Sequence, residues 1–346
     1  IGMNRDHNHH KGLFRRAAAV CLVGAMLISS VLYGLIGCDA PEPPDPASDG
    51  VLHVVVTSFP AEEFARAVLG DLLNGSGGEP VVLERLGKTG QDLHAFEPSA
   101  ADIRKLSGAD ILICIGSFAE TWLDGAIRAS GNRSLRVLSM TDVCELHEEE
   151  ELPGLGEHDH HHDHEHGEGT QVEYDEHVWT SFGNMARIVT AVRNTLTAAL
   201  PEQAATLQAN AASYLLELDA LRADYQATVA SAADPVLVIA DRYPFAYLMR
   251  ELGVVCYAAF PGCSSETQAS FSTQVMLTET VRDLHLPAVL YVDFGVASVA
   301  DAVSRATGVP VRRLWSGQVA SDTGLSYLDM LRENLVSLRA ALGVTG

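Results

Sequence analysis

Histidine and carboxylate side chains alternate along one short segment, the histidine-rich run at residues 157–166. It reads Glu-His-Asp-His-His-His-Asp-His-Glu-His and holds six of the chain's 14 histidines. Imidazole and carboxylate at this density bind zinc, copper or nickel, although a flexible array selects poorly among these ions. Glycines on both sides predict a loop rather than a packed element. We therefore expect a metal-binding loop, with a solvated charged insertion as the alternative.

Two isolated histidines lie in settings that suit a defined site. His94 stands in a polar loop expected directly before a helix. Such loops are where an open α/β sheet places its ligand residues. His177 closely follows the histidine-rich run, and Asp175 and Glu176 beside it could accept a hydrogen bond from its ring. Either histidine alone could be structural, and together they are the candidate metal ligands.

Short apolar strands alternate with helices on both sides of the chain's middle. Strands are expected at 51–57, 81–83, 111–115, 236–240, 254–258 and 288–292, and helices at 61–73, 98–106, 245–252, 298–307 and 327–342. Continuous apolar strands separated by helices indicate mainly parallel sheets with both faces covered. The roughly 300 residues after the first fifty suffice for two cores. The fold class is therefore α/β, with two lobes.

The segment between these halves, residues 183–230, contains no strand signal. From Pro201, a residue favoured in a first helical turn, apolar residues recur at helical spacing as far as Tyr225. A helix of about thirty residues is longer than the usual 8–20. We expect a connecting helix at 201–231 between an N-terminal lobe (51–200) and a C-terminal lobe (232–346). A surface helix of one lobe is the alternative.

Several stretches together resemble a known family, the zinc and manganese substrate-binding proteins of bacterial ABC importers. Residues 92–102 (DLHAFEPSAAD) and 175–179 (DEHVW) resemble the family's two histidine-bearing loops. A histidine-rich insertion just before the second loop is typical of the zinc branch, and residues 327–334 (YLDMLREN) resemble the end of the fold. The resemblance implies two lobes joined by a backbone helix, with a metal ion held by His94 and His177 in the cleft between them.

The second half departs from this family pattern. Many members carry a third histidine before the phenylalanine of a strand-to-helix turn, but residues 239–247 contain none, and Asp241 is the nearest donor. The family's fourth ligand would fall near residues 314–317, which hold no carboxylate. Glu266, on a loop that could face the cleft, and Asp293 are the candidates instead. Two histidines with two carboxylates, Asp241 and Glu266, could bind zinc tetrahedrally, while manganese tolerates oxygen donors and stays an alternative.

The first residues resemble an export signal. Basic residues precede the apolar run Ala17–Tyr33, and Leu-Ile-Gly-Cys ends at Cys38. This order is typical of a secretory signal, here residues 1–37. A permanent membrane anchor is the alternative. The tetrapeptide resembles the bacterial lipobox, which implies cleavage before Cys38 and a lipid on its thiol. Residues 38–50 would then be a flexible tether that holds an extracytoplasmic protein at the membrane.

Composition excludes some partners and leaves the cysteines open. A net charge of −22 argues against nucleic acid, which needs a basic face. No CxxC pair occurs, so a thiolate zinc site is not expected. Export permits disulfides, but the sequence does not fix how the four remaining cysteines pair: Cys114, Cys144, Cys256 and Cys263.

The resemblance implies a monomeric receptor that captures zinc outside the cell and passes it to the permease of an ABC importer. It would perform no catalysis. A manganese receptor of the same fold, or a surface adhesin or metal buffer, are the alternatives. A zinc hydrolase is less compatible, because the sequence holds no HExxH or GxSxG motif and a site closed by four protein ligands leaves no place for activated water.

Overall fold

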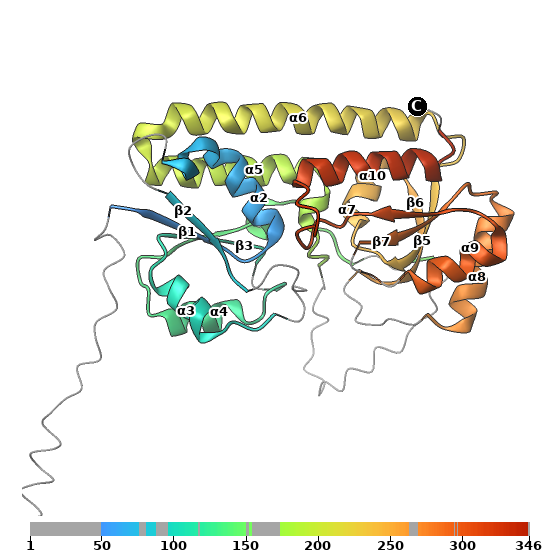
Figure 1. Cartoon of the computed structure of the whole chain (residues 1–346), viewed down its shortest axis with the longest axis horizontal. Coiled ribbons are helices and arrows are strands. Elements are labelled where there is room, and N and C mark those ends of the chain that lie inside the picture. The colour runs from blue at the N-terminus through green and yellow to red at the C-terminus, as the bar shows by residue number, and fades with distance from the viewer. Residues whose placement is uncertain are drawn as a thin grey trace, which may run out of the picture. The chain divides into compact units, whose positions relative to one another are not determined.

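Two four-stranded parallel sheets form the framework of the computed structural model (Figure 1). The structure describes residues 50–75, 81–87, 96–116, 118–149, 152–153, 174–262, 269–293, 295 and 297–344. The first sheet has the order β2-β1-β3-β4 and the second β6-β5-β7-β8. The strands are β1 (Leu52–Val56), β2 (Val81–Arg85), β3 (Ile111–Cys114), β4 (Arg136–Ser139), β5 (Val236–Arg242), β6 (Val255–Phe260), β7 (Val289–Val292) and β8 (Val311–Leu314). The α/β fold class with two lobes is confirmed.

Helices cover both faces of each sheet, because the central strands are apolar on both sides. Every side chain of β3 is buried, as expected for a strand enclosed between two helical layers. The N-terminal lobe carries α2 (Phe59–Leu69), α3 (Ala100–Ser107), α4 (Leu123–Ser130) and α5 (Phe182–Ala199). The C-terminal lobe carries α7 (Ala246–Leu252), α8 (Phe271–Asp283), α9 (Ser298–Thr307) and α10 (Tyr327–Ala341). The helices α3 and α4 lie below the first sheet, and α2 and α5 lie above it (Figure 1).

One hydrophobic cluster runs through both lobes. Buried side chains of α2 and α5 join those of α7 and α10 in this cluster. Two smaller clusters stay within single lobes, one under α3 and α4 and one under α8 and α9. The lobes therefore share a continuous core on the side where α5 and α10 lie, which limits how freely they can move.

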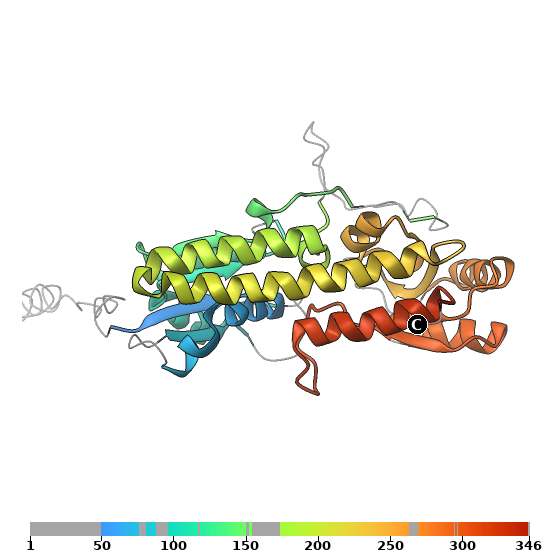
Figure 2. The same cartoon turned by 90° about the horizontal axis from the view of Figure 1, so that it is seen from above.

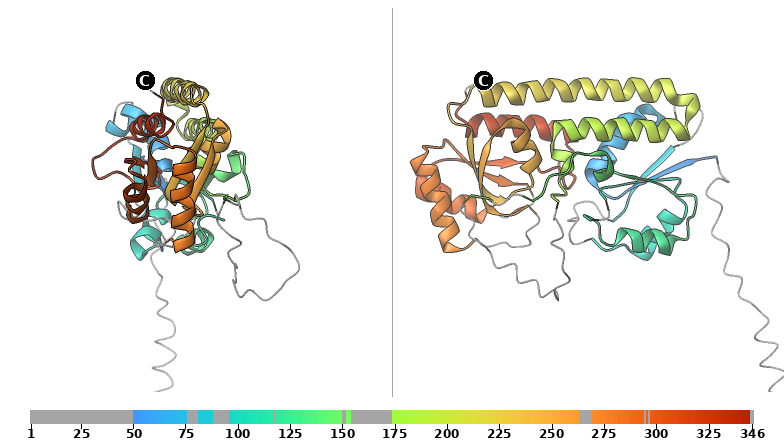
Figure 3. Two further views of the ribbon diagram at one scale, coloured as in Figure 1. Left: turned by 90° about the vertical axis from the view of Figure 1, so that its right-hand side faces the viewer. Right: turned by 180° about the vertical axis from the view of Figure 1, so that it is seen from behind.

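The helix α6 (Ala204–Ala230) lies where the sequence predicts one long helix, after a short 3-10 turn at Pro201–Gln203. Its 27 residues correspond to a length of about 40 Å. Seen from above, α6 lies between α5 and α10 (Figure 2), and the view from behind shows it running over both lobes (Figure 3). The hydroxyl of Tyr225 donates a hydrogen bond of 2.7 Å to the carbonyl of Leu331 in α10. Near its other end, the side-chain amide of Asn210 donates a hydrogen bond of 3.0 Å to the carbonyl of Val68 in α2, so the helix is fastened to both lobes.

Five of the helices and strands are absent from the sequence prediction: β4, β8, α4, α5 and α8. The strands β4 (RVLS) and β8 (VRRL) lie at sheet edges and are largely exposed, so they lack the apolar run of a central strand. The helix α8 carries threonines along an otherwise apolar stripe. In these segments the secondary structure depends on contacts with the rest of the fold and not on the local pattern of apolar residues.

Several predicted features lie outside the described residues. These are the signal, the tether, Cys38, His94, the histidine-rich run, Cys263 and Glu266. Among the residues that the structure does describe, no helix has the length and apolar character needed to cross a membrane. The thiols of Cys114 and Cys144 are free, and the pairing of Cys256 with Cys263 stays open because Cys263 is not described.

Candidate metal centre

His177 occupies a buried turn between the histidine-rich run and α5. Its side chain is fully buried, and it caps the 3-10 turn Val178–Thr180. One carboxylate oxygen of Asp175 accepts the backbone N–H of His177 at 2.7 Å and lies 2.8 Å from its Nδ1. This contact orients the ring and, in the neutral imidazole, places the proton on Nδ1 and the lone pair on Nε2. The predicted contact between Asp175 and the ring is present, and its role behind a metal ligand stays a prediction.

Contacts on both sides of His177 tie its turn to the C-terminal lobe. The hydroxyl of Tyr247, in α7, donates to the carbonyl of Asp175 at 2.7 Å. The indole of Trp179 donates to the carbonyl of Ser316 at 3.1 Å. The hydroxyl of Tyr327, at the start of α10, donates to the carbonyl of Trp179 at 2.8 Å. His177 therefore lies where the two lobes meet.

A glycine of the C-terminal lobe lies against the His177 ring. A Cβ atom at Gly262 would stand 2.9 Å from the carbonyl of Tyr243 and 3.2 Å from Cε1 of His177. The close approach leaves no room for a side chain. Gly262 is thus a point of the C-terminal lobe that contacts the imidazole. Glu266, the predicted donor four positions further along the chain, lies outside the described residues.

Asp241 is held within the C-terminal sheet. It is 4% exposed, and its two oxygens accept the backbone N–H groups of Arg242 at 2.8 Å and Val292 at 3.1 Å. Burial raises the pKa of this carboxyl, against the lowering effect of both hydrogen bonds and the charge of Arg242. The carboxylate therefore braces β5 to β7, and only its remaining lone pairs could reach a metal. Within the described residues, no group of three or more metal-binding side chains comes together.

Two buried acids, Asp175 and Glu176, act on His177, and a third, Glu120, is coupled to Glu176. Burial lowers the pKa of His177, but the charge and hydrogen bond of Asp175 and the charge of Glu176 outweigh it, so the pKa is raised. Glu120, after β3, accepts the backbone N–H groups of Ile115 at 2.9 Å and Gly116 at 3.2 Å. Burial raises its pKa to about 7, and the charge of Glu176 adds to the rise. Sequence reasoning missed Glu120, because a single glutamate outside any motif is typical of a surface residue.

Comparison with known proteins places the chain among zinc-binding relatives. The family model described as zinc-uptake complex component A, periplasmic, matches residues 54–341. The zinc-binding lipoprotein AdcA of Streptococcus pneumoniae is 27% identical over 321 residues, which cover 92% of this chain and 60% of AdcA. The high-affinity zinc uptake system protein ZnuA of Bacillus subtilis is 26% identical, covering 84% of this chain and 88% of ZnuA. The chain thus spans only about 60% of the length of the AdcA proteins.

Solved structures share the two-lobed architecture. The Zn(II)-bound ZnuA-like domain of AdcA from Streptococcus pneumoniae superposes with a TM-score of 0.66 at 24% identity, covering 85% of this chain and 99% of that domain. The laminin-binding adhesin of Streptococcus agalactiae gives 0.69 at 19% identity, with 84% and 99% covered. At these identities the likeness concerns the fold.

Proposed function

The chain belongs to the family of the periplasmic zinc-uptake component A, and on this premise we propose that it is an extracytoplasmic receptor that binds zinc and delivers it to an ABC importer. One observation carries the proposal. The imidazole of His177 is fully buried where the lobes meet, with Nδ1 held by Asp175. A ring fixed in this way, beside buried carboxylates, is arranged as metal-binding histidines usually are.

The proposed ligands are His94, His177, Asp241 and Glu266. The geometry of its turn supports His177, and the resemblance of its loop supports His94. For Glu266 the support is that Gly262, four positions before it in the chain, contacts the imidazole. Asp241 keeps lone pairs beyond its two backbone hydrogen bonds. Nitrogen donors would come from the N-terminal lobe (51–200) and oxygen donors from the C-terminal lobe (232–346), across the helix at 201–231.

The remaining parts of the proposal concern delivery. The histidine-rich run would raise the local metal concentration beside the cleft, and a lipid on Cys38 would hold the monomeric receptor at the membrane, near the permease that takes the ion. The similarity to AdcA, a zinc-binding lipoprotein, supports this anchoring. The family description, a periplasmic component of a zinc-uptake complex, supports a role in binding and release, and we propose that the chain performs no catalysis. Manganese is the competing cargo, favoured by the two carboxylates.

Zinc titration of the variant His177→Asn tests the proposal. Asparagine can keep a hydrogen bond to Asp175 through its amide N–H while removing Nε2. We expect zinc affinity to fall by more than about 100-fold. The matched control is His285→Asn, because His285 is exposed and has a positive φ of 52°, which asparagine tolerates. Unchanged affinity in His177→Asn would remove His177 from the site, and titration with manganese decides between the two ions.

A further inference from the structure

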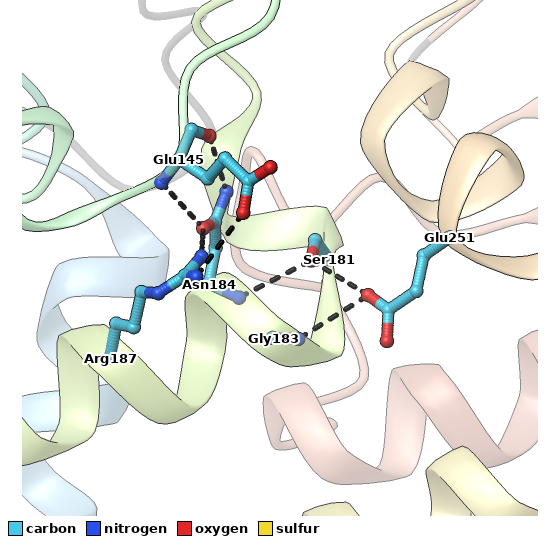
Figure 4. A network of polar contacts seen from close by, with 6 residues as sticks. All are labelled: Glu145, Ser181, Gly183, Asn184, Arg187 and Glu251. Atoms are coloured by element: carbon cyan, nitrogen blue, oxygen red, sulfur yellow. Dashed lines mark hydrogen bonds and ion pairs between the residues drawn. The ribbon is translucent and has the colours of Figure 1, made fainter.

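A carboxylate of the C-terminal lobe binds the first turn of a helix in the N-terminal lobe (Figure 4). Ser181 caps α5, accepting the backbone N–H of Asn184 at 3.2 Å. Its hydroxyl donates to Oε2 of Glu251, in α7, at 2.7 Å, and the backbone N–H of Gly183 donates to the same oxygen at 3.3 Å. Glu251 therefore joins α7 to the start of α5.

The same kind of contact occurs in the opposite direction. Ser326 caps α10, accepting the backbone N–H of Asp329 at 3.2 Å. The backbone N–H of Tyr327, the first residue of α10, donates to Oε2 of Glu63 at 2.9 Å. Glu63 belongs to α2 in the N-terminal lobe. A carboxylate of each lobe thus binds the N-terminal turn of a helix in the other.

The two contacts occupy equivalent places in the fold. The helices α2 and α7 each follow the first strand of their sheet, and α5 and α10 are each the last helix of their lobe. The two sheets also share one strand order. We call Glu63 and Glu251 the interlobe carboxylates.

Their surroundings make these contacts stronger than ordinary surface ones. A carboxylate at a helix N-terminus accepts an N–H group that has no partner within the helix, and it complements the helix dipole. The side chains of Glu63 and Glu251 are only 15% and 13% exposed, so solvent screens them little. Glu251 also forms an ion pair with Arg222 of α6, with Nε and Oε1 2.8 Å apart. Its carboxylate thus joins α5, α6 and α7.

Both contacts act on the turn that carries His177. Glu251 binds Ser181 and Gly183, a few residues beyond His177. Glu63 holds Tyr327, whose hydroxyl in turn binds the carbonyl of Trp179. We propose that Glu63 and Glu251 are positioning residues that fix the orientation of the two lobes and thereby set the cleft before metal binds. The geometric part stands without the metal site, and the effect on metal rests on the proposed function.

The distance between the lobes in metal-free protein tests the geometric part. Spin labels carried by unnatural amino acids at Ala129 in α4 and Ala306 in α9, both exposed, leave the native cysteines in place. We expect the double variant Glu63→Ala/Glu251→Ala to broaden the distance distribution measured by pulsed electron resonance. The variant Glu63→Gln/Glu251→Gln keeps an acceptor for the backbone N–H groups and should restore part of the original width.

Two control variants remove glutamates whose ion pairs stay within the N-terminal lobe. Glu62 pairs with Arg66 and Arg85, and Glu145 pairs with Arg187. The variants Glu62→Ala and Glu145→Ala should leave the distribution unchanged. An unchanged distribution in the folded double alanine variant overturns the proposal. Should that variant not fold, amide exchange at Gly183 in the single variant Glu251→Ala and at Tyr327 in Glu63→Ala decides, since each loses the acceptor of that amide and the proposal requires both amides to exchange faster.

Metal release provides the second readout. We expect the double alanine variant to release zinc faster, on the order of tenfold, while the two controls do not. A wider distance distribution with unchanged release would overturn the link to the metal site. Failure of the unaltered protein to bind zinc tightly would overturn the proposed function and leave the distance result standing.

Discussion

The two lobes share one strand order yet hold their buried polar groups differently. In the N-terminal lobe, the turn before α5 presents the fully buried ring of His177, held at Nδ1 by Asp175. In the C-terminal lobe, Asp241 lies within β5, with both oxygens engaged by backbone N–H groups. The first lobe thus fixes a nitrogen donor on a turn, and the second uses its buried acid to brace the sheet.

This difference suggests that the two lobes would contribute differently to metal affinity and to the choice of metal ion. In the proposed site, a preset imidazole would give affinity before the second lobe contributes, because its orientation does not have to be established on binding. The donors proposed from the C-terminal lobe, Asp241 and Glu266, would supply oxygens, which zinc and manganese both accept. Choice between the two ions would therefore depend on the second lobe, and affinity on the first.

The largest expected effect is on the pH dependence of the free energy of unfolding, through Glu120, a buried acid of the N-terminal lobe. Glu120 is 3% exposed and its pKa is raised from 4.5 to about 7 by burial. An acid whose folded pKa is raised contributes stability that is complete below its unfolded pKa and is lost as pH rises through the folded value. We expect Glu120→Gln to be more stable than the unaltered protein at about pH 8, by on the order of 3 kcal/mol, and similar at about pH 5.

Chemical denaturation of both proteins across this pH range checks the prediction. Glu145→Gln, at an exposed carboxylate, is the control and should follow the unaltered protein. A constant difference between Glu120→Gln and the unaltered protein at all pH values would mean that Glu120 does not titrate in this window.

The hydrogen bond that orients His177 comes next. The carboxylate of Asp175 holds Nδ1–H of His177 and raises the basicity of the ring. Asn at this position removes that negative charge. We expect Asp175→Asn to bind zinc about 10–100-fold more weakly while remaining folded. Calorimetric titration measures this, with circular dichroism to verify the fold. If Asp175→Asn bound zinc as tightly as the unaltered protein, the ring would need no support from Asp175. The contrast between an N-terminal lobe that fixes its donor in advance and a C-terminal lobe that does not would then disappear.

The smallest effect is expected at Asp241. In Asp241→Asn, an amide N–H₂ would replace one of the two oxygens and face the backbone N–H of Arg242 or Val292. We expect a loss of about 1 kcal/mol or more in the free energy of unfolding. The control is Asp219→Asn, on the exposed side of α6. Unchanged stability would mean that Asp241 does not brace the sheet, whether or not it binds zinc, and the contrast between the two lobes would then disappear.

Local pattern predicted the parts of this molecule that depend on neighbouring residues. The central strands, the long helix and the Asp175–His177 contact, which spans two residues, could all be predicted. Contacts between segments that are distant in the sequence could not be predicted. Examples are Ser181 with Glu251, 70 positions apart, and Trp179 with Ser316, 137 positions apart. No periodicity marks Glu63 or Glu251 as different from other helix-surface glutamates. Edge strands such as β8 also escaped, since their exposure removes the apolar signal.

The decisive measurement is an anomalous-scattering map at the zinc edge, from crystals grown with one equivalent of zinc. We expect one strong peak at about 2.0–2.1 Å from Nε2 of His177, with the remaining ligands drawn from His94, Asp241 and Glu266. A single ion bound only by the histidine-rich run, with none at His177, would contradict it.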